Sequence, residues 1–406
     1  MADVKELVAF LKSRQGLFSS PNSDFFKKRL YERIQGDVVA FMKTVGFDEM
    51  KRIPECYTEK KNCPPELKEF FVNASRFSIL GEPSTSQDPL PCVIKSVKPK
   101  KAYEISRFVD GVRPLCSKHG IARIVDIGCG IGHLLRAFNA SGSAFELVGI
   151  ECNVDFVKTG KKMSDDIEFI NVLLSKDTPQ EELDRIFGPS EHKTAIVSLH
   201  GCGDLQPFLI ELFTRLPRER FPLLATIACC YHKMSPESFP MKRELDFELG
   251  KPALRLACEQ RLKKLEIYGE EDHQKQAFAL ISKGIVECFY ERMGIDITSK
   301  PRGFCRNLGE DIPTILATIL ARNDVPETEA ATWKAAFNAL LEEHEESFDF
   351  VQHFIILQLA LQPALESLIL SDRLAYVKSQ GYEHFSVIPI FDSNISPRNM
   401  LLIVER

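Results

Sequence analysis

The middle of the chain alternates short apolar runs with segments in which apolar residues recur at helical spacing. Apolar runs typical of strands lie at residues 124–127, 145–151, 166–171, 195–199 and 221–229. The segment after the fourth run has apolar residues at 205, 208, 209, 212, 213 and 216, which is a helical period. Strands that alternate with helices predict an α/β fold with a mostly parallel sheet covered by helices.

The flanking regions differ from this middle part. Residues 1–78 and 239–349 show helical spacing without a clear pair of strands, and residues 352–380 form a further helical pattern, expected to break or kink at Pro363. Two last apolar runs, 384–391 and 400–404, predict a terminal β-hairpin. The prediction is therefore a helical N-terminal region (1–90), a sheet core (91–238), a helical insertion (239–350), and a last helix with the hairpin (351–406).

Composition narrows the class of protein. Apolar residues make up 44% and charged residues 27% of the 406, as in ordinary globular proteins. The segment Phe354–Leu370 is too short and too polar to span a bilayer, so a buried helix is expected and no association with a membrane.

The 12 cysteines lack the dense spacing of a secreted disulfide framework, and the first residues do not resemble a signal peptide. A reducing compartment is predicted, the cytoplasm first and the nucleus second. A net charge of −5 argues against bulk electrostatic binding to DNA, although it permits a local basic groove.

A glycine-rich turn stands between the first apolar run and the helix after it. Asp126 is followed by Gly128, Gly130 and Gly132, so the backbone can approach a ligand closely and the helix start can offer N–H groups to it. A dinucleotide fingerprint would need glycine where the chain has His133. The second run ends in Glu151, which is placed to accept ribose hydroxyls. The residues alone leave open a site for another nucleotide, or a turn that binds nothing.

Polar residues also follow the later strands. Asn171 ends the third run, as a candidate adenine contact or a turn-forming residue. The fourth run leads into His200-Gly-Cys-Gly-Asp204, where Asp204 holds the N-cap position of the next helix. The fifth apolar run leads into Cys229-Cys-Tyr-His232. Parallel strand ends share one sheet edge, so both loops are expected beside the cofactor. Ahead of the glycine turn, the basic stretch Lys98-Pro-Lys-Lys101 is an exposed helix start or a guide for an anionic substrate.

The Asp-x-Gly-x-Gly-x-Gly stretch followed by a strand-terminal acid resembles motifs I and II of class I S-adenosylmethionine-dependent methyltransferases. Further stretches resemble the methyltransferase-like protein 25 family: Lys-Pro-Lys-Lys before Glu104, His-x-Cys-Gly-Asp at 200–204, Cys-Cys-Tyr at 229–231, Phe-Pro-Met at 239–241, Leu-x-Asp-Arg at 370–373 and Ser-Pro-Arg-Asn at 396–399. The family often has His where this chain has Tyr103. The resemblance implies a Rossmann-like class I fold with a seven-stranded sheet and S-adenosyl-L-methionine as cofactor. The implied cofactor residues are Asp126, Gly128, Cys129, Gly130, Gly132, Glu151, Asn171 and Leu199.

The substrate expectation is RNA, transfer RNA or ribosomal RNA, because His-x-Cys-Gly and Cys-Cys-Tyr are similar to a pair of motifs in transfer-RNA 2′-O-methyltransferases. No Asn-Pro-Pro-Tyr or Asp-Pro-Pro-Tyr follows the fourth run, which speaks against adenine N6 chemistry. His200 is the candidate base, and Tyr231 and His232 are candidates for orienting the substrate. A protein or small-molecule substrate and a non-catalytic scaffold are the alternatives.

A metal site is the remaining alternative for these loops. His200, Cys202, Cys229, Cys230 and His232 offer enough nitrogen and sulfur ligands for zinc. No Cys-x-x-Cys spacing is present, and adjacent Cys229 and Cys230 would point in opposite directions on an extended backbone. The prediction is therefore that these residues serve catalysis, substrate positioning or packing, and hold no metal.

Overall fold

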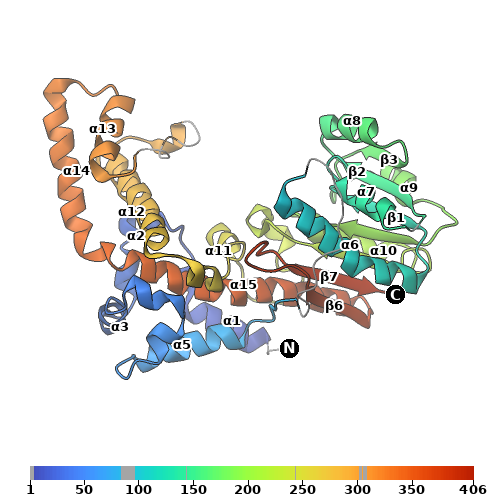
Figure 1. The fold of residues 1–406 in the computed structure, drawn as a ribbon, viewed down its shortest axis with the longest axis horizontal. Helices are drawn as coiled ribbons and strands as arrows, with labels where there is room; N and C mark the ends of the chain where they lie inside the picture. Colours follow the sequence, from blue (N-terminus) through green and yellow to red (C-terminus); the bar gives the residue numbers. More distant parts are fainter. Residues whose placement is uncertain (1–3, 84–96, 143, 243, 301–303, 305–308) are drawn as a thin grey trace. The chain divides into compact units, whose positions relative to one another are not determined.

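A computed structural model describes residues 4–83, 97–142, 144–242, 244–300, 304 and 309–406. The chain divides into two compact units (Figure 1). Unit 1 comprises Met1–Val8, Phe77–Gln260 and Gln362–Arg406, and unit 2 comprises Ala9–Arg76 and Arg261–Leu361. The division into four segments drawn from the sequence stays a prediction, and its first boundary, between residues 90 and 91, lies outside the described residues.

Unit 1 is built on one sheet that, within the described ranges, has seven strands. They are β1 (Arg123–Ile127), β2 (Glu146–Glu151), β3 (Ile167–Asn171), β4 (Thr194–Ser198), β5 (Leu223–Ile227), β6 (His384–Pro389) and β7 (Met400–Glu405). Their order is β3-β2-β1-β4-β5-β7-β6, and β7 pairs in antiparallel orientation with both of its neighbours, β5 and β6. This arrangement confirms the predicted Rossmann-like class I methyltransferase fold with its terminal hairpin.

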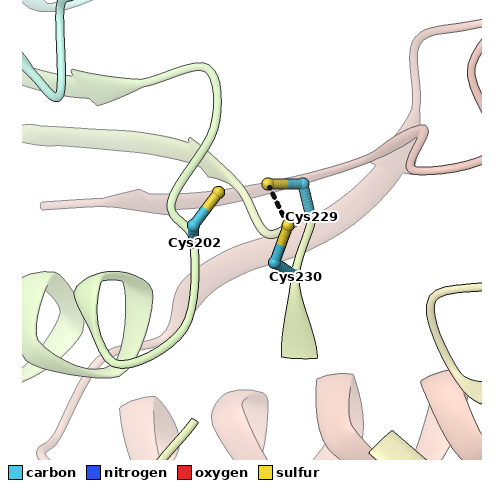
Figure 2. A group of neighbouring side chains, drawn as sticks. All are labelled: Cys202, Cys229 and Cys230. Atoms are coloured by element: carbon cyan, nitrogen blue, oxygen red, sulfur yellow. Dashed lines mark hydrogen bonds between the residues drawn. The ribbon is translucent and has the colours of Figure 1, made fainter. Parts of the chain in front are cut away.

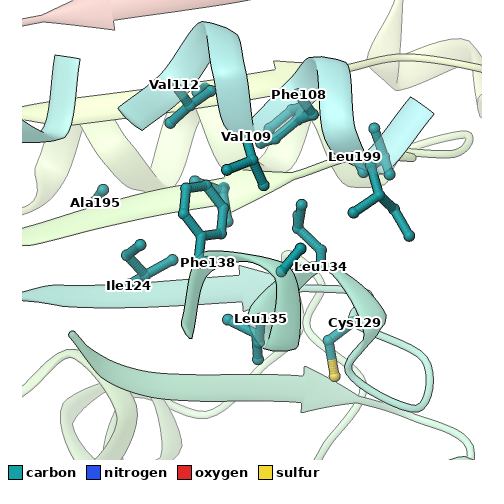
Figure 3. Close-up of a cluster of buried hydrophobic side chains, with 14 of the residues drawn as sticks. Phe108, Val109, Val112, Ile124, Cys129, Leu134, Leu135, Phe138, Ala195 and Leu199 are labelled. Carbon is teal, nitrogen blue, oxygen red and sulfur yellow. The ribbon is translucent and has the colours of Figure 1, made fainter. Parts of the chain in front are cut away.

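Helices cover both faces of this sheet. On one face lie α6 (Pro99–His119), α7 (His133–Ala140) and α8 (Val154–Met163), and on the other α9 (Gln180–Phe187) and α10 (Leu205–Arg215). Ile124 of β1 packs into the first layer, while Val125 and Ile127 pack into the second. Figure 3 shows the first layer, where Phe108 and Phe138 meet between α6 and α7. Both faces are buried, which explains why the strands read as continuous apolar runs.

The register brings the functional loops to one edge. β1 pairs in parallel with β2 and β4, and β4 pairs in parallel with β5. The chain reverses its order of strands between β1 and β4, and ligands bind at such a switch point, beyond the carboxyl ends of the strands. The glycine turn after β1 and the loops after β4 and β5 therefore belong to the same edge.

Three short helices follow β5 in unit 1: η4 (Tyr231–Lys233), η5 (Pro236–Ser238) and α11 (Lys251–Leu256). Among the described residues of unit 2, every regular element is a helix. The helix α1 (Val4–Ser13) begins in unit 1 and ends in unit 2. The further elements of unit 2 before α15 are η1 (Gln15–Leu17), α2 (Asp24–Lys27), η2 (Leu30–Arg33), α3 (Gly36–Met42), η3 (Phe47–Lys51), α4 (Glu55–Thr58), α5 (Pro65–Arg76), η6 (Leu262–Ile267), α12 (Glu270–Arg292), η7 (Ile297–Ser299), α13 (Ile312–Arg322) and α14 (Glu327–Phe348). Aromatic contacts such as Phe289 with Phe337 hold α12 against α14.

The helix α15 (Val351–Ser379) contradicts the expected break, because it continues through Pro363, while the alternative of a kink there stays a prediction. A proline removes only one backbone donor, and the residues around this one are buried, so tertiary packing outweighs the local cost. Within the described residues, α15 is the one helix that is long and apolar enough to cross a membrane. Its most apolar window is 94% buried, as in the core helix of a globular protein.

Candidate functional site

The glycine turn is held in shape by its own backbone. The N–H groups of Gly128 and Cys129 both donate to the carbonyl of Ile150, at 2.9 and 3.1 Å. Gly128, Gly130 and Gly132 have φ values of +77°, +59° and +84°, which side chains other than glycine rarely adopt. These N–H groups thus already donate hydrogen bonds within the protein. What the turn presents to a ligand is a backbone surface of fixed shape.

Open space lies in front of the middle glycine. A side-chain carbon placed on Gly130 would meet no atom within 4 Å, whereas one placed on Gly132 would lie 2.7 Å from the Phe169 ring. Two predicted cofactor residues, Cys129 and Leu199, are 8% and 7% exposed and belong to the core layer of Figure 3. Because these two side chains are buried, any contact with a ligand would be made mainly by the backbone atoms of the two residues.

Both carboxylate oxygens of Glu151 accept backbone hydrogen bonds, one from the glycine turn and one from the loop after β2. Oε2 accepts from the Gly130 N–H at 3.0 Å, and Oε1 accepts from the Asn153 N–H at 2.9 Å. The Asn171 amide group donates to the carbonyls of Glu151 and Cys152, at 2.8 and 3.0 Å. Asn171 therefore fastens the loop that carries Glu151, and both hydrogens of its amide nitrogen are used in doing so.

Two buried titratable groups flank the turn. Burial raises the pKa of Asp126 to about 7, with a smaller contribution from Glu151, and Lys101 opposes the shift. Burial lowers the pKa of His133 to about 4, and the charges of Lys101 and Arg136 lower it further. The positive charge of the exposed Lys101 contributes to the pKa shifts of both groups. Arg136 donates to His133 Nδ1 at 2.8 Å, which leaves the ring proton on Nε2.

His200 faces a buried carboxylate. Its Nε2 lies 3.4 Å from Oε2 of Glu104, and Ser396 Oγ donates to Oε1 of Glu104 at 2.7 Å. Burial disfavours the charged carboxylate, but the hydrogen bonds from His200 and Ser396 outweigh it and lower the pKa of Glu104. The arrangement orients the imidazole as the third member of a catalytic triad orients its base. The structure therefore joins three stretches of the family resemblance in one contact.

Tyr231 has a different environment from the one predicted. It is 2% exposed, its hydroxyl donates to Oε1 of Glu366 at 3.2 Å, and the Arg373 guanidinium lies 5.2 Å from its ring. His232 is half-buried, and burial, Arg255 and Lys233 lower its pKa. Across the described ranges, His200, Tyr231 and His232 share no hydrogen bond. Because the whole Tyr231 side chain is enclosed, its geometry fits support of the loop better than contact with a substrate.

Acidic side chains from distant positions brace these loops. Asp204 lies at the N-cap position directly before α10, as predicted, but its side chain makes no cap hydrogen bond and accepts instead from the Ser235 N–H at 2.6 Å, so the predicted capping role is wrong. Asp372 accepts from the N–H groups of Met241 and Lys242, at 2.7 and 3.0 Å. The Leu-x-Asp-Arg stretch thus holds the Phe-Pro-Met loop. Tyr103, where the family often has His, accepts from the Asp392 N–H at 2.8 Å.

The cysteines after β4 and β5 correct another expectation. The sulfur atoms of Cys229 and Cys230 lie 3.5 Å apart, and with Cys202 all three lie within 4.8 Å of one another (Figure 2). They converge because β5 ends at Ile227 and the backbone at Cys230 (φ −125°, ψ 66°) is no longer extended. Hydrogen bonds, first from Cys229 and also from Cys230, lower the pKa of Cys202 to about 6, against the effect of burial.

Comparison with known proteins adds to this geometry. Residues 100–237 match a family model described as a methyltransferase domain. The chain thus contains a methyltransferase domain. The probable methyltransferase-like protein 25 of Mus musculus is 24% identical over 221 residues, which are 50% of this chain and 36% of that protein. The Homo sapiens protein of the same name is 26% identical over 221 residues, 50% of this chain and 35% of that protein. The match therefore spans little more than a third of the length of either relative.

Several solved structures similar to this chain are described as methyltransferases. The plantazolicin methyltransferase BamL, in complex with a triazolic desmethylPZN analog and SAH, has 13% identity and a TM-score of 0.25, with 75% of this chain and 92% of that one covered. A putative sarcosine dimethylglycine methyltransferase from Galdieria sulphuraria has 10% identity and a TM-score of 0.24, with 61% and 82% covered. At such scores the assignment of the methyltransferase domain rests on the strand order and the family match.

The methyltransferase domain fits S-adenosylmethionine. The turn leaves space at Gly130, where a side-chain carbon would meet no atom within 4 Å, and the Glu151 carboxylate still has lone pairs for ribose hydroxyls. The ammonium of Lys101 has the charge to pair with the cofactor's carboxylate.

Sequence reasoning missed the partners of the predicted residues. Glu104 was noted only as an acid near a basic stretch, and its pairing with His200 was not foreseen. The last 45 residues of the chain contain the other partners, Glu366, Arg373 and Ser396. The one signal that pointed to them was the family resemblance at 370–373 and 396–399.

Proposed function

We propose that this protein is an S-adenosylmethionine-dependent methyltransferase that acts on RNA. The observation that carries the methyltransferase part is the clamp of Glu151 onto the Gly130 N–H at the end of β1 and β2, in a sheet of order β3-β2-β1-β4-β5-β7-β6. The domain match over residues 100–237 supports the same activity.

The residues of the turn would bind and orient the cofactor. Glu151 would accept hydrogen bonds from the ribose hydroxyls, and Lys101 would pair with the carboxylate of the methionine part. S-adenosylmethionine supplies a methyl group on a positively charged sulfur, which an oxygen or nitrogen nucleophile can attack in line. The protein's contribution is then to bring the two reactants together in the correct geometry.

His200 would act as the base that accepts the proton of the nucleophile. Glu104 holds the imidazole through Nε2, which leaves Nδ1 for the substrate, and its negative charge stabilises the imidazolium that forms. The half-exposed His200, at 41% of its side-chain surface, is accessible to a substrate, whereas Glu104 at 6% is not.

RNA is the proposed substrate class because of two features. The His-x-Cys-Gly and Cys-Cys-Tyr stretches resemble a pair in transfer-RNA 2′-O-methyltransferases, and the exposed Lys98 and Lys101 at the start of α6 could contact phosphates. Lys101 can serve only one of its two proposed partners at a time, so Lys98 is the stronger phosphate candidate. A protein or a small molecule is the alternative substrate, and a non-catalytic scaffold the alternative function.

The test is transfer of a labelled methyl group. The purified full chain is mixed with tritiated S-adenosylmethionine in two separate reactions. One contains total RNA and the other contains protein extract, both from cells that lack this protein. Label in RNA that is absent with His200→Ala supports the proposal. Label in protein alone contradicts the RNA part, and cofactor binding without transfer to any fraction favours the scaffold.

A further inference from the structure

Three thiols meet beyond the carboxyl ends of β4 and β5. Cys202 lies in the loop after β4, and Cys229 and Cys230 follow β5 directly. Their sulfur atoms point toward one another and all lie within 4.8 Å, with 3.5 Å between Cys229 and Cys230 (Figure 2). A disulfide needs sulfur atoms about 2.05 Å apart, so these are separate thiols. All three residues are half-buried, which protects the group and leaves a path to it.

The two loops are fixed to each other, so the thiols are held in place before any ligand arrives. The Gly201 N–H donates to the Ile227 carbonyl at 2.8 Å, and the Asp204 carboxylate accepts from the Ser235 N–H at 2.6 Å. Gly203 adopts φ +59°, and a side-chain carbon there would lie 2.9 Å from the Lys233 carbonyl. Glycine is thus needed for this close approach, and the convergence is a property of the fold.

We propose that Cys202, Cys229 and Cys230 form a binding site for one zinc ion. Zinc takes thiolates at about 2.3 Å in a tetrahedron, which places the sulfur atoms about 3.8 Å from one another. The observed spacing, 3.5 Å for one pair and up to 4.8 Å for the others, reaches this with side-chain movements of a fraction of an ångström to about one ångström. As each Zn–S bond forms, a thiol that still carries its proton releases it to solvent.

Among the described residues, the group of potential metal ligands contains these three sulfur atoms alone, which leaves the fourth zinc position open. The Nε2 atom of His200 faces Glu104, and the Cys258 sulfur accepts from the Tyr231 N–H at 3.0 Å while it donates to the Leu254 carbonyl at 3.2 Å. Water or an external ligand would complete the tetrahedron. An ion at this position would tie the loop that carries His200 to the loop that carries Tyr231.

The test measures metal directly in the full chain. Protein purified without chelators, loaded with zinc chloride and passed through a desalting column should retain about one zinc per chain by elemental analysis. Cobalt in place of zinc should give an intense thiolate-to-cobalt absorption band in the near ultraviolet. Cys202→Ser, Cys229→Ser and Cys230→Ser should each weaken zinc binding at least about tenfold in competition with a chromophoric chelator. Cys56→Ser, at another half-buried free cysteine, should leave it unchanged.

Two results would overturn the site. One is a wild-type chain that retains less than about a tenth of an equivalent of zinc and shows no cobalt–thiolate band, a measurement that does not depend on the folding of any variant. The other is a disulfide between Cys202 and either Cys229 or Cys230 in unreduced protein, found by peptide mapping. Neither readout involves methyl transfer, so the zinc site and the proposed function can fail separately.

Discussion

The carboxyl edge of the sheet has two halves that are built in different ways. At the ends of β1 and β2, the turn is shaped by backbone hydrogen bonds and positive φ angles, with Glu151 clamped 21 residues from Gly130. At the ends of β4 and β5, side chains from distant positions brace the loops: Glu104, itself held by Ser396, contacts His200, and Glu366 holds Tyr231.

The difference separates the binding of the cofactor from the chemistry. The hydrogen bonds of the first half join the loop after β1 to the end of β2, so its geometry depends on residues that are near one another in the sequence. The second half depends on contacts that span up to 292 residues, so the position of His200 is sensitive to changes far along the chain. Substitutions in the two halves should therefore affect different measurements.

The largest effect is expected at Gly130. Gly130→Arg should weaken S-adenosylmethionine binding more than about 100-fold in calorimetry, because the side chain would fill the open space of the turn. Gly142→Arg is the matched control, since Gly142 also has a positive φ (+84°) and open space around it but lies after α7. If the two variants bind the cofactor equally well, the pocket has been misplaced.

His200→Ala tests the other half. It should leave cofactor binding within about twofold and slow methyl transfer about 10² to 10⁴-fold, as the loss of a general base does. Single-turnover transfer on the accepted substrate measures this. Unchanged transfer would make His200 a packing residue.

Glu151→Ala should give an intermediate loss of binding. Two charge-assisted hydrogen bonds to the ribose would be removed, so we expect about 10 to 100-fold weaker cofactor binding in calorimetry. Glu104→Ala is the comparison from the other half and should bind the cofactor normally. A Glu151 variant with full affinity would mean that the ribose lies elsewhere.

Asp126 makes the stability of the methyltransferase domain depend on pH. Its pKa is raised to about 7 by burial, so the folded state holds this proton between the ordinary value of 3.8 and about 7, while the unfolded chain releases it. Stability should therefore fall as pH rises through that window. Asp126→Asn should remove this part of the decline and raise the melting temperature at pH 8 by a few degrees. Melting temperatures from pH 5 to 8 in calorimetry decide this, and parallel curves for both proteins would contradict it.

The smallest effect is expected at Tyr231. Tyr231→Phe removes one hydrogen bond to the buried Glu366, which should cost about 1 to 2 kcal/mol of stability. The transfer rate should stay within about twofold if the side chain only supports the loop. A large loss of rate without loss of stability in urea denaturation would restore the predicted catalytic role.

The same contrast explains what the sequence could predict. The positions of the strands along the chain and the glycine turn followed from local patterns, because each depends on residues close together in the chain. The seven-stranded sheet was implied by the family resemblance. The partners of His200 and Tyr231 could not be derived, since no local pattern tells which of many buried acids faces a given loop. The direction of Cys229 and Cys230 was wrong because an extended backbone was assumed where β5 had already ended. The predicted break at Pro363 was wrong because burial outweighed the local preference of proline.

Calorimetry of the full chain with adenosine cofactors tests the central claim most directly. We predict that S-adenosylmethionine binds at one site per chain, that S-adenosylhomocysteine competes for it, and that NAD does not, because His133 stands where a dinucleotide turn needs glycine. Binding of NAD with no binding of S-adenosylmethionine would contradict the account.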